Sequence, residues 1–181
     1  NHRLQVFRLS DQPPCAGVPP LRRALHSGLR TLGSGKGSAL GQLNGPVGVA
    51  LDVAADIVLV ADCDNHRLQV FRLSDGTALR TLGSGEGSAL GQLHHPVGVA
   101  LDVAADIALV AEYCRDNHRL QMFHLSDGTA LRTLGSGEGS DLGQLNDPCD
   151  VALDVAEPPF AGVPPLRRHC TPDPGPASCS S

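Results

Sequence analysis

Residues 41–90 of this 181-residue chain spell GQLNGPVGVALDVAADIVLVADCDNHRLQVFRLSDGTALRTLGSGEGSAL, and the predicted architecture follows from this unit. The unit recurs almost unchanged over residues 91–142. Its second half precedes it in residues 1–40, and its first quarter follows in residues 143–156. Self-similarity with a period of about 40–50 residues is typical of solenoids and propellers. The chain is therefore a tandem array.

Four short runs of aliphatic and β-branched residues, separated by turn residues, predict an antiparallel meander in each unit. In the second unit we expect strands over residues 47–53, 57–61, 67–73 and 78–82. Large and small side chains alternate along the first strand, whereas the second is apolar at every position and needs cover on both faces. The fourth strand is half polar, so burial should decrease from the first two strands to the last.

This gradient favours a propeller, in which inner strands are enclosed between neighbouring sheets and outer edges meet water. A two-sheet sandwich would instead give each strand one polar face. We therefore predict an all-β fold, a partial and open β-propeller of about three four-stranded antiparallel blades. Partial blades would occupy residues 1–40 and 143–156, and full blades residues 41–90 and 91–142. Such an array cannot close a ring, and apolar flanks exposed at its ends would allow self-association.

The predicted turns differ in strength. Asp75-Gly76 is a dipeptide that hairpins prefer, whereas residues 54–56 (Ala-Ala-Asp) contain no glycine. The long connection after the fourth strand should pack Leu90 and Leu93 beneath itself.

Two segments do not fit the repeat. Residues 11–27 interrupt the first partial blade, and residues 157–181 form a tail that is rich in proline and serine and should be disordered. A block in the insertion, residues 13–23, recurs as residues 158–168 at another phase of the repeat, which suggests a transposed or misjoined coding segment. The chain lacks an initiator methionine, so we expect it to be a fragment of a longer protein.

Several spaced elements of the unit, repeated in register, resemble the NHL repeat, whose arrays form β-propellers. In the second unit these elements are GQL at residues 41–43, Pro46, GVA at 48–50, Asp52, VAD at 60–62 and NHRLQVF at 65–71. The chain departs from the family pattern at Ala55 and Ala105, where the family usually has glycine, and at Cys149-Asp150, which replace Val-Gly.

The resemblance implies a non-catalytic scaffold that binds a protein partner, often at the end of ubiquitin-ligase chains that bear RING and B-box modules. Two alternatives stay open, because some NHL propellers bind single-stranded RNA and one branch is a peptidylglycine lyase with a metal held by histidines. None of the six cysteines has zinc-finger spacing, so no ligase module can be assigned to these residues.

The loops after the second and fourth strands of a blade emerge on one face, and we expect binding there. His94-His95 replace Asn44-Gly45 in one copy only. The candidate binding residues on this exposed face are Asp62, Asp64, His94, His95, Glu112, Arg115 and Asp116. The face is acidic, which disfavours RNA because phosphate needs the opposite charge. Two histidines near carboxylates could bind a metal, but adjacent residues rarely share one ion, so we predict no metal and no cofactor.

Other patterns are better explained by structure than by chemistry. Residues 33–38 (GSGKGS) lack the spacing of a phosphate-binding loop, and Glu86 and Glu138 occupy the position of Lys36 in other copies. The recurring Asn-His-Arg should satisfy a turn and start the third strand of each blade. We find no paired nucleophile and base, and no run of about 18 apolar residues that would span a membrane. The sequence therefore predicts neither an enzyme nor a membrane protein.

Overall fold

The computed structural model describes residues 4–6, 30–113 and 117–154. Within these ranges the regular structure consists of strands and one short 3-10 helix, η1 (Cys63–Asn65). The strands are β1 (Leu4–Val6), β2 (Arg30–Leu32), β3 (Pro46–Asp52), β4 (Ile57–Asp62), β5 (Arg67–Arg72), β6 (Ala78–Leu82), β7 (Pro96–Asp102), β8 (Ile107–Glu112), β9 (Arg119–His124) and β10 (Ala130–Leu134). No helix among these residues is long and apolar enough to cross a membrane.

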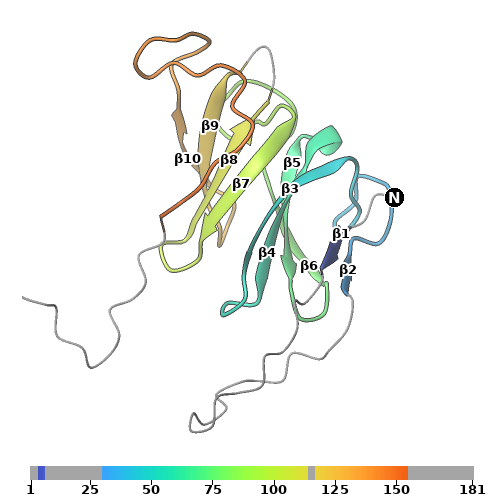
Figure 1. Ribbon diagram of the computed structural model, residues 1–181. Helices are drawn as coiled ribbons and strands as arrows, with labels where there is room; N and C mark the ends of the chain where they lie inside the picture. The colour runs from blue at the N-terminus through green and yellow to red at the C-terminus, as the bar shows by residue number, and fades with distance from the viewer. Residues whose placement is uncertain (1–3, 7–29, 114–116, 155–181) are drawn as a thin grey trace, which may run out of the picture.

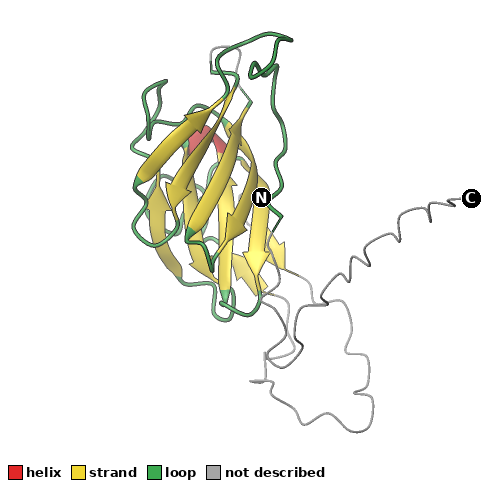
Figure 2. Cartoon of the chain, turned by 90° about the vertical axis from the view of Figure 1, so that its left-hand side faces the viewer, coloured by secondary structure: helices red, strands yellow, loops and turns green. Residues whose placement is uncertain are grey.

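The strands form three antiparallel sheets that stand face to face (Figures 1 and 2). Strands β3 to β6 make one four-stranded meander, β7 to β10 make a second, and β1 pairs with β2 in a two-stranded remnant of a third. This arrangement confirms the predicted all-β fold, an open and partial propeller. The predicted strands of the second unit agree with β3 to β6 to within one residue at each end.

Aspartates make the first turn of each blade possible without glycine. Asp56 and Asp106 adopt positive φ angles of 63° and 60°, a conformation that Asp tolerates better than most residues. The N–H of Ala55 also donates a 2.9 Å hydrogen bond to Oδ1 of Asp52. The turn between β5 and β6 is wider than a two-residue hairpin, because Arg72 bonds to both Gly76 and Thr77.

The main core lies between the two four-stranded sheets, where β3 and β4 pack against β7. The backbones approach so closely that a Cβ atom on Gly48 would lie 1.8 Å from the carbonyl oxygen of Val97. A second, smaller core joins the β1–β2 remnant to the other face of the next sheet, around Leu32, Val58 and Phe71. In the β7–β10 sheet, burial decreases from the inner strands to the outer strand, as predicted.

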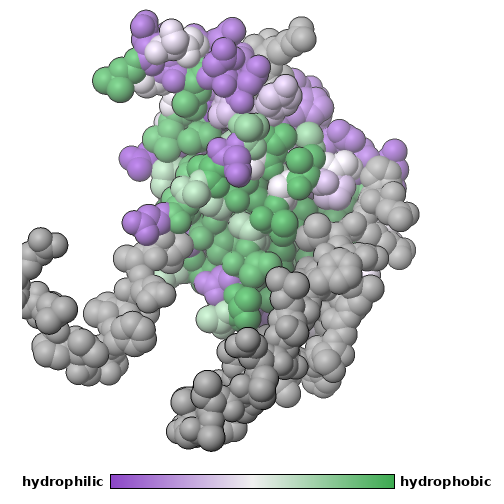
Figure 3. Space-filling model, viewed as in Figure 1, coloured by the Kyte–Doolittle hydropathy of each residue, from purple (hydrophilic) through white to green (hydrophobic). Residues whose placement is uncertain are grey.

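One face of β3 breaks this gradient. Val49 and Leu51 are 44% and 47% exposed, whereas their counterparts in the next unit, Val99 and Leu101, are 7% and 8% exposed. The remnant β1–β2 corresponds to the outer half of a blade and leaves β3 uncovered. Figure 3, drawn in the view of Figure 1, shows a broad apolar area in the middle of the molecule. In this view β3 and β7 face the reader. This open flank confirms the expected apolar end of the array.

The connection between the sheets matches the sequence prediction only in part. Leu93 is fully buried beneath it, as expected, but Leu90 is 53% exposed, so that expectation was wrong. Leu93, at the end of this connection, is held by a parallel β-bridge to Glu86. The insertion at residues 11–27 and the tail at residues 157–181 lie outside the described residues.

Candidate functional site

A buried carboxylate stands at the end of the second strand of each blade. Asp62 is completely buried and accepts hydrogen bonds from the backbone N–H of Asn44 (2.6 Å), Nδ2 of Asn65 (2.8 Å) and Nε of Arg67 (2.7 Å). Nε2 of Gln69 donates a further bond of 3.1 Å to it. The Asn and Arg of the recurring Asn-His-Arg motif therefore have the structural role that the repeat pattern predicted.

Glu112 forms the same network in the next unit. It is completely buried and accepts bonds from Arg119 (2.8 Å), Gln121 (2.7 Å), Asn117 (2.7 Å) and the backbone N–H of His94 (2.9 Å). The prediction that Asp62 and Glu112 are exposed binding residues was therefore wrong, because each carboxylate is enclosed by its own arginine, asparagine and glutamine.

The network also fastens the connection between blades. Nη2 of Arg67 donates a 2.9 Å bond to the carbonyl of Gln42, and the N–H of Gly41 donates a 2.9 Å bond to Oε1 of Gln69. One buried carboxylate per unit thus links the loop after the second strand to the incoming connection. This polar cluster holds the loop face in place.

Three histidines gather where the two four-stranded sheets meet on this face. His66 follows η1, and His94 and His95 lie in the connection that leads to β7. The rings of His66 and His94 are stacked with centroids 5.2 Å apart, and the ring of His95 lies edge-on, 4.8 Å from each of them. One ring nitrogen from each residue lies within 4.8 Å of the others, and all three residues are partly buried.

Hydrogen bonds and acidic groups orient these rings. The N–H of His95 donates a 3.3 Å bond to Nδ1 of His66. Oxygens of Glu86 lie 3.8 Å from Nε2 of His66 and 3.3 Å from Nε2 of His94. Nδ1 of His95 lies 3.5 Å from Sγ of Cys63. Burial is the main cause that lowers the pKa of His66 from its usual value.

The sequence predicted other neighbours for the histidine pair. We expected His94 and His95 beside Glu112, Cys114 and Asp116 of their own unit. The backbone N–H of His94 bonds to Glu112, and the rings meet His66 and Glu86 of the preceding unit. Cys114 and Asp116 lie outside the described residues. The sequence already placed His66 on the same face as His94 and His95, because it lies in the loop after the second strand. Its recurrence in every unit, however, favoured a purely structural role.

The remaining predicted residues are Asp64, Arg115 and Asp116. Asp64 is exposed, as predicted, and belongs with Cys63 and His95 to a second group of nearby metal-binding atoms. Arg115 and Asp116 lie outside the described residues.

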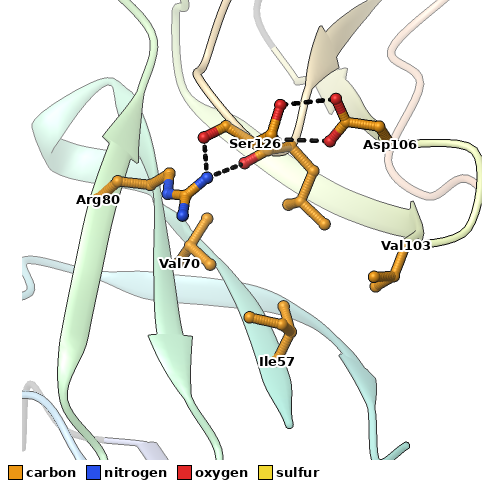
Figure 4. Close-up of a pocket in the computed structure, with 7 residues that line it drawn as sticks. Ile57, Val70, Arg80, Val103, Asp106 and Ser126 are labelled. Atoms are coloured by element: carbon orange, nitrogen blue, oxygen red, sulfur yellow. Dashed lines mark hydrogen bonds between the residues drawn. The ribbon is translucent and has the colours of Figure 1, made fainter. Parts of the chain in front are cut away.

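A shallow pocket lies between the two main sheets (Figure 4). Its charged groups are already occupied: Arg80 donates a 2.9 Å bond to the carbonyl of Leu125, and Asp106 accepts bonds from the N–H (2.7 Å) and the hydroxyl (2.6 Å) of Ser126. The bonds from Ser126 lower the pKa of Asp106. Here the polar groups hold turns together at the edge of the pocket.

The meander blades and the repeated carboxylate network define a β-propeller repeat protein. The family model for the NHL repeat matches residues 43–71, so the chain carries an NHL repeat, as the spaced elements indicated. No curated protein matches the chain.

Two solved structures of computationally designed proteins are similar to the chain. The Ika4 protein is 17% identical with a TM-score of 0.36, over 61% of this chain and 59% of its own. The Ika8 protein is 14% identical with a TM-score of 0.30, over 70% of this chain and 46% of its own. The chain thus spans less than two thirds of either designed protein.

Proposed function

We propose that the chain is a non-catalytic NHL-repeat scaffold that binds a protein partner through the uncovered face of β3. The proposal rests on one observation, the exposure of Val49 and Leu51 at positions where Val99 and Leu101 are almost completely buried. Val47 and Val53 extend the same row and are 60% and 53% exposed. We call these four residues, Val47, Val49, Leu51 and Val53, the β3 stripe. A row of large aliphatic side chains on one face is typical of an interaction surface.

The next interface in the array indicates what kind of partner fits. The counterpart of the β3 stripe on β7 is covered by the antiparallel pair β3–β4. Strand β3 approaches with the small residues Gly48 and Ala50, and Gly48 lies against the backbone of Val97, whereas β4 contributes Leu59 and Ala61. The partner should therefore contribute a β-hairpin equivalent to residues 46–62, with Gly or Ala on one strand and a large aliphatic side chain on the other toward the β3 stripe. Main-chain shape and apolar side chains would together provide specificity, as in other strand-based recognition.

The loop face supports a protein partner over a nucleic acid. Glu86 and Glu138, whose side chains are 63% and 65% exposed, project acidic groups there, and phosphate would be repelled. The role in a ubiquitin ligase that the resemblance implies belongs to this proposal: the array would recruit the partner, and other modules would perform the transfer.

A titration with the full chain tests the proposal. A cyclised hairpin peptide with the sequence of residues 46–62 should bind the full chain, measured by isothermal titration calorimetry. Leu51→Asp should weaken binding at least about tenfold, because it places a charge in the apolar contact. Leu142→Asp is the matched control, since Leu142 is fully exposed and lies away from the β3 stripe.

Three results would reject the proposal. The first is a failure of the unmodified chain to bind the hairpin, and the second is equal binding by Leu51→Asp. The third is self-association of the chain, seen by sedimentation and abolished by Leu51→Asp, since the β3 stripe would then be covered by a second copy.

A further inference from the structure

We infer that His66, His94 and His95 form a Zn²⁺ site that fastens the loop of one blade to the start of the next. His66 comes from the blade of β3 to β6, and the other two histidines come from the connection into β7. The site is independent of the β3 stripe and of the partner proposed above.

The geometry of the three rings suits zinc. Zinc–nitrogen bonds of about 2.1 Å place the nitrogens of a tetrahedral site about 3.4 Å apart. The ring nitrogens already lie within 4.8 Å of one another, so modest side-chain rotations would bring them around one ion. Imidazole is a preferred ligand of zinc.

Glu86 completes a four-coordinate set. Its two oxygens lie beside Nε2 of His66 and Nε2 of His94, at 3.8 and 3.3 Å. A carboxylate in this position can bind the ion directly as the fourth ligand and balances its charge. Three imidazoles and one carboxylate would leave no open position, which is typical of a structural zinc rather than a catalytic one.

Ligation would change the tautomer of the first histidine. Nδ1 of His66 accepts the N–H of His95 at 3.3 Å, so the proton of the neutral ring lies on Nε2. Zinc binding at Nε2, beside Glu86, would move this proton to Nδ1 and replace that long hydrogen bond.

The neighbouring junction of the same chain provides an internal comparison. There the N–H of Asp147 donates a 3.1 Å bond to Nδ1 of His118, and Glu138 lies 3.7 Å from Nε2 of His118. The backbone bond to Nδ1 and the glutamate beside Nε2 are thus the same at both junctions, but Asn146 and Asp147 stand where the first junction has His94 and His95. These two contacts form without the histidine pair, and the pair is what adds metal-binding capacity.

Cys63 could compete for a place in the site, because Cys63, Asp64 and His95 also lie within 4.8 Å of one another. The three-histidine set is favoured because it has Glu86 beside two of its nitrogens, and a Cys63→Ser variant distinguishes the two sets. A tie between blades is useful here, because an open array lacks the ring closure that holds a complete propeller together.

The test uses the full chain, stripped of metal with a chelator and titrated with ZnCl₂. We expect one zinc more per chain than in the double variant His94→Asn, His95→Asp, measured by calorimetry and by metal analysis after dialysis. Zinc should raise the midpoint of thermal unfolding of the unmodified chain and not that of the variant. The double variant copies the neighbouring junction and should keep the β-sheet circular dichroism of the parent.

Two further variants assign the ligands. Cys63→Ser should bind zinc like the parent, and its Co²⁺ form should have the same spectrum, without a thiolate-to-metal band. His118→Asn, at the neighbouring junction, should also leave binding unchanged. Equal zinc stoichiometry in the parent and the double variant would overturn the inference, as would loss of binding in Cys63→Ser.

Discussion

Nε of Arg67 donates a 2.7 Å hydrogen bond to Oδ2 of Asp62, and the Asp62 side chain is completely shielded from water. The same carboxylate accepts a bond from the backbone of Asn44, which belongs to the connection from the preceding blade. Breaking a buried ion pair by removing one partner leaves an uncompensated charge, which costs far more than losing an exposed pair. The stability of the loop face therefore depends on Asp62 and its counterpart Glu112.

Asp62→Ala should lower the free energy of unfolding by about 3–5 kcal/mol, because Arg67 and the N–H of Asn44 would lose their acceptor in a buried place. Urea unfolding followed by circular dichroism measures this. The control is Asp64→Ala, two residues away and exposed, which should change stability by less than about 0.5 kcal/mol. Similar effects of the two substitutions would show that the buried network does not carry this energy.

Gly48 and Gly98 have the same place in successive units but different neighbours. A Cβ atom at Gly48 would lie 1.8 Å from the carbonyl oxygen of Val97, in a strand held within a sheet. At Gly98 the nearest atom is Cα of Asp150, at 2.5 Å, in a segment without strand pairing. The first neighbour cannot yield, whereas the second can shift.

We therefore expect Gly48→Ala to cost about 3 kcal/mol or more and Gly98→Ala about 1 kcal/mol, both measured by urea unfolding. The order of the two effects is the decisive result. A larger loss from Gly98→Ala would mean that residues 147–154 are held as firmly as β7.

The strands and their arrangement could be predicted from the sequence because the relevant signals are local and repeated. Alternation in residues 47–53 and the apolar run at residues 57–61 reflect side chains that touch neighbouring sheets on one or both faces. Two complete copies and two partial copies of the unit reinforce the pattern. The open propeller followed from these features, and the NHL match at residues 43–71 agrees with it.

The site was predicted less well because its contacts connect different units. A carboxylate at the end of a strand has the same sequence signal whether it is exposed or paired, and only the joint recurrence of an acid with Asn, Arg and Gln pointed to burial of Asp62 and Glu112. His66 meets His95 because a positive φ of 53° turns its backbone toward the connection of the next blade. Such contacts depend on how blades stack, which the pattern within one unit does not contain.

Cys63 should react slowly with alkylating reagents. Burial raises its pKa from 9.0 to about 11, so its thiolate fraction near pH 8 falls about 100-fold. Exposed Cys149 provides the comparison within the same chain. Peptide mass spectrometry after brief iodoacetamide treatment of the metal-free chain should show Cys149 modified well before Cys63, with the rate at Cys63 still rising between pH 9 and about 11. Equal rates at pH 8 would contradict the buried, acid-flanked environment of this thiol.

Leu51 and Leu101 test the open flank directly, because they occupy the same position of successive units and differ chiefly in cover. Leu101 is 8% exposed and packs in the core between the sheets, so Leu101→Ala should cost about 2–5 kcal/mol. Leu51 is 47% exposed, and Leu51→Ala should cost less than about 1 kcal/mol. Urea unfolding of the isolated chain measures both values.

If a bound hairpin covers the β3 stripe, the cost of Leu51→Ala should rise toward that of Leu101→Ala when the peptide is present in excess, because the same side chain then loses an apolar contact. An equally large cost for Leu51→Ala without any peptide would mean that the face is already covered in the free chain.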